Sequence, residues 1–117
     1  MVDLDVCIEA IRRAIVYGWD IANFRRKYPK DQDLFVRTTV ECFTESLRAI
    51  AENCPIPDYK KESLLDKYRK LKDTTWQTAF RYMLNEDIIR VTIDDTLAYL
   101  RDYLGYKPTK YDKYIPK

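Results

Sequence analysis

Residues 36–50 read VRTTVECFTESLRAI and show the clearest helical pattern in the chain. The apolar side chains of this stretch recur at steps of three and four residues, which places them on one face of an α-helix. These positions are Val36, Val40, Phe43, Leu47 and Ile50. The polar turn before the stretch offers Asp31 or Asp33 as an N-terminal cap, and the sequence CPIPD at 54–58 ends the helix. We therefore expect a long helix with one buried face.

The N-terminal region repeats this helical spacing. Its apolar positions are Leu4, Cys7, Ile8, Ile11, Ala14 and Ile15. A continuous helix on this spacing would bring Arg25 onto the buried face. We therefore expect the helix to break or bend between Gly18 and Asn23, before Pro29 closes the region.

A third helical region is expected at about residues 60–84, with Asp58 as its cap. Its apolar face comprises Leu64, Tyr68, Leu71, Thr75, Ala79 and Met83. The run KDTT at 72–75 offers a point at which this region divides. A last helix is expected from Asp94 or Asp95, with Gly105 as its C-terminal stop and a core of Leu97, Leu100 and Leu104.

These elements predict an all-α fold, a compact bundle of four to six helices with short connections. Residues 1–105 are expected to form one domain, because a chain of 117 residues can bury a single core. Residues 106–117 alternate lysine and tyrosine and include two prolines. They are expected to form a flexible, basic and tyrosine-rich tail. We expect the protein to be a monomer.

The composition excludes several classes of catalytic site. The chain has no histidine, which removes Ser/His/Asp and Cys/His catalysis and all histidine-ligated metal sites. Its two glycines, Gly18 and Gly105, cannot build a glycine-rich phosphate loop. We therefore expect no catalytic residue and no metal site, and a function that depends on binding.

The three cysteines and the N-terminal residues predict the cellular compartment. Cys7, Cys42 and Cys54 have no CxxC spacing and are odd in number, so we expect neither a disulfide framework nor a thiolate metal site. Cys7 and Cys42 are expected to be plain buried thiols. The acidic start MVDLDVC does not resemble a signal peptide, and no apolar run is long enough to span a membrane. We expect a cytoplasmic protein.

The net charge of +2 hides a strong segregation of charge along the chain. Residues 11–30, 59–83 and 106–117 carry net charges of +5, +4 and +3, whereas the three segments between and before them are acidic. One explanation is that acidic and basic helices pair across a solvated surface. The other is that the basic segments converge on one face and bind a polyanion. The sequence leaves both open.

Helical geometry places one set of basic residues on a common outer stripe. At 100° per residue, a single helix would align Lys67, Lys70, Thr74, Gln77 and Arg81 opposite the apolar face. Lys60 and Lys61 add charge at the start of the same region. Trp76 is either core or a ring on which a base stacks, and Tyr82 is a second stacking candidate. The stripe suits the backbone of a nucleic acid.

The first basic segment combines four cations with two aromatic residues. The sequence FRRKYPK at 24–30 supplies Arg25, Arg26, Lys27 and Lys30 for phosphate groups, with Tyr28 as a stacking ring. The alternative is a solvated helix end whose cations complement the helix dipole.

Two segments, YGWDIANFRRKYPKDQD at 17–33 and YKKESLLDKYRKLKDTTWQTAFRYM at 59–83, carry a resemblance to a known family. They resemble the helix-bundle domain that follows the primase–polymerase domain in replication proteins of crenarchaeal (Sulfolobus-type) plasmids. The resemblance implies an accessory domain that binds single-stranded template DNA and a nucleoside triphosphate such as ATP, with or without Mg²⁺. A neighbouring catalytic domain would then synthesise the primer.

Two functions of other classes compete with this interpretation. A helical adaptor would display a contiguous apolar patch to a partner protein. A coat or architectural protein would assemble on duplex DNA. Basic segments 24–30 and 60–81 on one face favour nucleic-acid binding, whereas opposite faces favour simple charge pairing.

Overall fold

The computed structural model describes residues 4–85 together with Arg90, Asp94 and Ala98. This part of the chain contains four α-helices and no strand: α1 (Leu4–Arg26), α2 (Asp33–Asn53), α3 (Asp58–Lys72) and α4 (Trp76–Asn85). The all-α bundle expected from the sequence is confirmed. The expected last helix, apart from Asp94 and Ala98, lies outside the described residues, as does the tail at 106–117.

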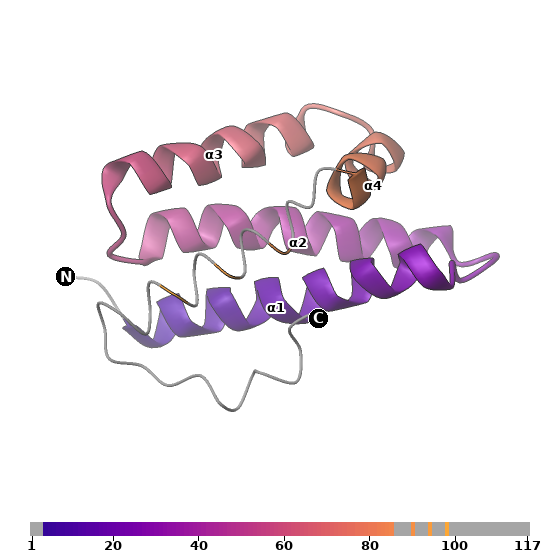
Figure 1. Ribbon diagram of the computed structural model, residues 1–117, viewed down its shortest axis with the longest axis horizontal. Coiled ribbons are helices and arrows are strands. Elements are labelled where there is room, and N and C mark those ends of the chain that lie inside the picture. Colours follow the sequence, from indigo (N-terminus) through magenta and orange to yellow (C-terminus); the bar gives the residue numbers. More distant parts are fainter. Residues whose placement is uncertain (1–3, 86–89, 91–93, 95–97, 99–117) are drawn as a thin grey trace.

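The second helix, α2, is the centre of the bundle. It packs against α1, α3 and α4, whereas α1 and α3 do not pack against each other. In Figure 1, α1, α2 and α3 run side by side with α2 in the middle, and α4 lies across one end of them. The five positions that periodicity places on the apolar face of the stretch at 36–50 are all buried: Val36, Val40, Phe43, Leu47 and Ile50.

Three buried polar side chains of α2 satisfy their hydrogen-bonding groups within the helix. The hydroxyls of Thr39 and Thr44 donate to the carbonyl oxygens of Phe35 and Val40, four residues earlier, at 2.9 and 2.8 Å. Ser46 donates to a carbonyl oxygen three residues earlier. Because these groups are paired, their burial leaves no unsatisfied donor in the core.

The expected break in the first helix is wrong, because α1 continues without interruption to Arg26. After Ile15 its buried face moves to Gly18, Ile21 and Phe24. These positions follow Ile15 at steps of three residues, so the buried face shifts around the helix and does not continue along the line that leads to Arg25. Arg25 is therefore exposed, and no break is needed to keep its charge in water.

The third helical region divides at residues 73–75, where the sequence offered a break. Thr75 caps α4, because its hydroxyl oxygen accepts a hydrogen bond from the backbone N–H of Thr78 at 3.2 Å. The cap expectations for α2 and α3 are wrong. Gln32 and Pro57 occupy the cap positions, neither makes a side-chain cap bond, and Asp33 and Asp58 begin the helices. There the carboxylates still complement the helix dipole.

The expectation of unpaired cysteines is wrong for two of the three. Cys7 and Cys54 form a disulfide between the first turns of α1 and the C-terminal cap of α2, with their Cα atoms 5.0 Å apart. Both residues are fully buried, and Cys42 is free and half-buried. Sequence spacing gave no sign of this pair, because 47 residues separate its members. We call this part, with residues 54–61, the disulfide end.

Candidate nucleic-acid interface

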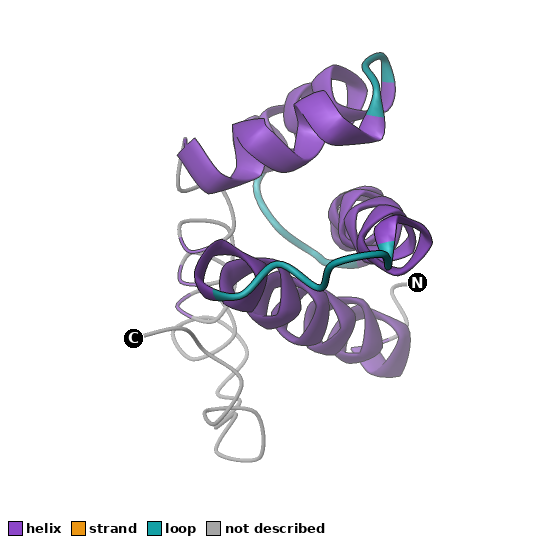
Figure 2. Ribbon diagram, turned by 90° about the vertical axis from the view of Figure 1, so that its right-hand side faces the viewer, coloured by secondary structure: helices purple, strands orange, loops and turns teal. Residues whose placement is uncertain are grey.

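The first basic segment lies at the opposite end of the bundle, where α1 leads into α2. Figure 2 looks at this end, with the connection between the two helices in front. Arg25 and Arg26 occupy the last turn of α1, and Lys27, Tyr28 and Lys30 follow in the connection; all five are exposed. We call residues 24–35, together with α4, the loop end.

The connection turns tightly before α2 begins. The backbone N–H of Gln32 donates to the carbonyl oxygen of Pro29 at 3.2 Å, and Asp31 adopts a left-handed conformation with φ of 62°. Aspartate tolerates this region better than most residues with a Cβ atom. The turn presents Lys30 to solvent beside the last turn of α1.

Four aromatic rings link the connection to α4. Phe24 packs edge-on against Phe35 and Phe80, with ring centroids 5.6 and 6.3 Å apart, and Tyr28 packs against Phe80 at 5.9 Å. Phe24 and Phe80 are buried, but Tyr28 is 39% exposed and Phe35 is 50% exposed. Aromatic pairs favour such edge-on and tilted arrangements. The rings therefore form a continuous chain whose two outer members face solvent.

A hydrogen bond fixes the Tyr28 ring at the surface. Its hydroxyl donates to Oδ1 of Asp33 at 2.8 Å. The bond to the Asp33 carboxylate raises the pKa of the Tyr28 phenol, which favours its neutral form. The ring is thus held on one side by Phe80 and at its tip by α2.

Part of the basic stripe predicted in the third helical region also lies at the loop end. Lys70, near the end of α3, lies with its Nζ atom 3.3 Å from the Tyr82 hydroxyl and 5.1 Å from the centre of that ring. This cation–π contact joins α3 to α4. Gln77 and Arg81, on α4, are exposed. Because α4 lies across the end of α3, however, the expected straight stripe with Lys67 does not form (Figure 1).

Trp76 lies at the junction of α3 and α4. It is half-buried and packs against the core, beside a cavity of about 130 Å³ lined by apolar and polar side chains of α2, α3 and α4. Of the two roles weighed for this ring, the contacts favour core packing. The exposed ring nearby is instead that of Phe35, which was not among the residues predicted from the sequence.

Lys60 and Lys61 lie at the other end of the molecule. They are in the first turn of α3, beside the end of α2, whereas the loop end adjoins the start of α2 (Figure 1). Both are half-buried. The basic segment at 60–81 therefore extends over the whole length of the bundle, and only its C-terminal part approaches residues 24–30.

The described cations fall into two groups, those that form ion pairs and those that do not. Most described pairs connect residues of one helix, as in Arg37–Glu41, Arg48–Glu52, Arg69–Asp66 and the pairs of Arg12 and Arg13 with Glu9. Lys72 and Glu45 form an interhelical pair at 2.7 Å. Within residues 4–85, none of the cations predicted to bind phosphate forms an ion pair: Arg25, Arg26, Lys27, Lys30, Lys60, Lys61, Lys67, Lys70 and Arg81. The ion pairs of the described residues therefore do not neutralise these charges, which are available to an anionic ligand.

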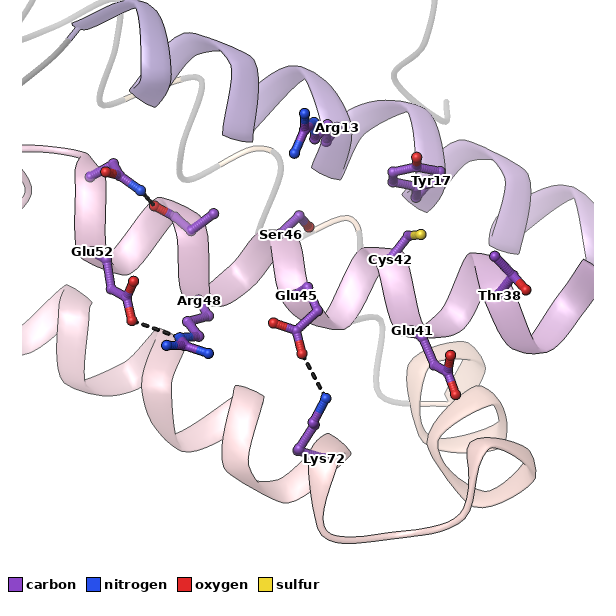
Figure 3. A pocket seen from close by; sticks show the side chains of 12 residues that line it. Arg13, Tyr17, Thr38, Glu41, Cys42, Glu45, Ser46, Arg48, Glu52 and Lys72 are labelled. Atoms are coloured by element: carbon purple, nitrogen blue, oxygen red, sulfur yellow. Dashed lines mark hydrogen bonds and ion pairs between the residues drawn. The ribbon is translucent and has the colours of Figure 1, made fainter.

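The outer face of α2 shows the opposite pattern. Figure 3 shows a groove of about 610 Å³ along this face, between α1 and α3, in which acidic and basic side chains neutralise each other. The hydrogen bond from Lys72 lowers the pKa of the Glu45 carboxyl. Deeper in the groove, the Cys42 sulfur raises the pKa of the Tyr17 phenol. This groove has no excess of either charge and does not favour a polyanion.

Two further classes of site were sought in the described residues. They include no group of three or more acidic or cysteine side chains placed to hold a metal ion. None of their helices is both long and apolar enough to cross a membrane.

Comparison with known proteins gives no relative from which to transfer a function. No family model, curated protein or solved structure matches this chain.

Proposed function

We propose that the protein binds single-stranded nucleic acid at the loop end. The observation that carries this proposal is the combination of exposed rings with cations that have no acidic partner in the described part of the chain. The rings are those of Tyr28 and Phe35. The cations are Arg25, Arg26, Lys27, Lys30 and Arg81.

Each component has a defined role in such binding. The arginine guanidinium groups donate paired hydrogen bonds to phosphate oxygens, and the lysines contribute point charges. Neutralising phosphates releases counterions, which supplies most of the affinity of sequence-independent binding. Planar rings at the surface then contact the bases, which in a single strand are free to stack.

The finer proposal follows the resemblance to the plasmid replication proteins. The bundle would hold the template strand and a nucleoside triphosphate for a primase–polymerase domain elsewhere in the same protein, without a catalytic residue of its own. Lys70, Gln77 and Tyr82 lie on the helices beside the loop end and could contact the triphosphate or the template from there.

The proposed cellular compartment must be one in which the Cys7–Cys54 disulfide can form and persist. Buried disulfides are rare in most cytoplasmic proteins, but they are common in the intracellular proteins of hyperthermophilic archaea. We place the protein in the cytoplasm of such an organism, which agrees with the crenarchaeal resemblance and with the Cys7–Cys54 bond.

The test is a titration of the whole chain with an oligothymidylate of about eight nucleotides, followed by tryptophan fluorescence, at several salt concentrations with and without ATP. Three or four phosphate contacts predict a slope of about −2 to −3 in a plot of log K against log salt concentration. Competition with duplex DNA separates this function from assembly on duplexes. The absence of a saturable, salt-sensitive response in either condition would refute the proposal.

A second candidate is the helical adaptor, which one observation favours. Leu34 is 75% exposed and adjoins Phe35 at the start of α2, so the loop end displays two neighbouring apolar side chains. A protein partner that covers them would be recognised through apolar contacts. Its association would be nearly independent of salt and would not compete with the oligonucleotide.

A further inference from the structure

We propose that Phe35 and Tyr28 form a two-ring platform on which unpaired bases stack. This inference rests on the proposed function and specifies the ligand of that site. On this proposal the loop end binds single strands through their accessible bases, and does not recognise phosphate groups alone.

The arrangement of the rings supports this role. Phe35 and Tyr28 are the exposed outer members of the chain of four rings, and the buried inner members, Phe24 and Phe80, support them from below. The supporting rings come from α1 and α4, so the platform depends on three helices and the connection between them. Such support lowers the entropy that a surface ring would lose when a base binds.

The polar contacts of the platform agree with stacking. Tyr28 is oriented by its hydrogen bond to Asp33, which occupies the hydroxyl and leaves the ring as the part available to a ligand. Phe35 has no polar atom, so stacking is the specific contact that it can offer. A base has an aromatic face whatever its identity, and this makes the platform tolerant of sequence.

The neighbouring charges place phosphates beside the rings. Arg25 and Arg26 directly follow the supporting residue Phe24, Lys27 precedes Tyr28, and Arg81 follows the supporting residue Phe80. A strand whose bases lie on the rings would thus have exposed cations from the same elements available for its backbone. A duplex hides its base faces and would use the cations only.

The experiment compares ring-removing variants with matched controls in the titration described above. Phe35→Ala and Phe35→Leu remove the ring, and the second keeps much of the apolar volume in case the first impairs folding. Leu34→Ala is the control, because Leu34 is more exposed and belongs to the same turn but has no ring. We expect both Phe35 variants to weaken oligothymidylate binding about tenfold and Leu34→Ala to leave it within about twofold.

Tyr28 has its own pair of controls. Tyr28→Ala should weaken binding about tenfold, Tyr28→Phe should restore most of the affinity because it keeps the ring, and Tyr59→Ala should have no effect. Tyr59 is a suitable control because it is 72% exposed and lies at the disulfide end.

An abasic strand of the same length distinguishes failure of the platform from failure of the proposed function. The wild-type protein should bind it at least tenfold more weakly than oligothymidylate, and the ring variants should bind it as the wild type does. Equal binding of both strands, or equal losses for Leu34→Ala and Phe35→Ala, would overturn the platform and leave nucleic-acid binding intact. Failure of the wild type to bind either strand would overturn both.

Discussion

The two ends of the bundle are held together by different means. At the disulfide end, the bond between Cys7 and Cys54 joins α1 to the end of α2. Cys54 and the nearby Ile56 are buried. At the loop end, aromatic contacts join α1, α2 and α4, and two of the four rings remain exposed. One end is thus fixed by a covalent bond, whereas the other leaves aromatic and basic side chains exposed.

The charges follow the same division. Along the outer face of α2, carboxylates and cations pair with each other and cancel. At the loop end the cations lack such partners within the described residues, and the carboxylates that residues 24–35 and α4 themselves contain are those of Asp31 and Asp33. Asp33 already accepts the Tyr28 hydrogen bond. A polyanion would therefore approach the loop end more favourably than the groove.

The largest effect is expected from removing the disulfide. The Cys7→Ala/Cys54→Ala variant should lose about 4 kcal/mol of stability, because the bond closes a loop of 47 residues in the unfolded chain. Thermal unfolding should show a melting temperature lower by about 15 °C, with Cys42→Ala as the control for loss of a thiol. At a temperature where the variant is folded, its oligonucleotide affinity should equal that of the wild type. An unchanged melting temperature, or a loss of affinity, would contradict the division between the ends.

An intermediate effect is expected from the cap of α4, which anchors the loop end. Thr75→Ala removes the hydroxyl that accepts the Thr78 N–H and should cost about 1 kcal/mol in chemical denaturation. Because α4 carries Phe80, fraying of its first turn should also weaken oligonucleotide binding slightly. Thr74→Ala is the matched control, since Thr74 is exposed and makes no described hydrogen bond. Equal stability of the two variants would show that the cap does not hold α4.

The smallest effect is expected at the Glu45–Lys72 pair on the outer face of α2. A double-mutant cycle with Glu45→Gln and Lys72→Gln should give a coupling of about 0.5 kcal/mol at neutral pH, as is typical of exposed pairs. Lys72 lowers the pKa of Glu45 in the folded state, so this stabilisation is complete above the ordinary glutamate pKa of 4.5 and is lost as the pH falls through the lowered value. Coupling that persists in acid, or a change in oligonucleotide affinity, would contradict this assignment.

Periodicity was enough to predict the helices, because each must bury one apolar face. The stretch at 36–50 and the division at 73–75 follow directly from the sequence. The course of α1 does not, since the choice between a break and a continuous helix depends on how its buried face packs against α2. The sequence shows the residues that suggested a break, Gly18 and Arg25, but it does not show how α1 packs against α2.

The candidate site was predictable only in its basic part. The cations of residues 24–30 are visible as a cluster in the sequence, and their exposure follows from their charge. Phe35 could not be found in this way. Leu34, Phe35 and Val36 are three consecutive apolar residues, and periodicity predicts the burial of Val36 but does not show whether another element covers Leu34 and Phe35. The disulfide was equally inaccessible, because it joins distant residues.

The central claim is that the loop end, and not positive charge in general, binds the strand. Two double variants test it most directly: Arg25→Gln/Arg26→Gln at the loop end and Lys60→Gln/Lys61→Gln at the disulfide end. Each removes two positive charges, so any effect of net charge is matched. The arginine variant should bind oligothymidylate about tenfold more weakly, with a salt slope smaller in magnitude by about 1.4, and the lysine variant should bind almost as the wild type does. Equal losses of affinity in the two variants would contradict the claim.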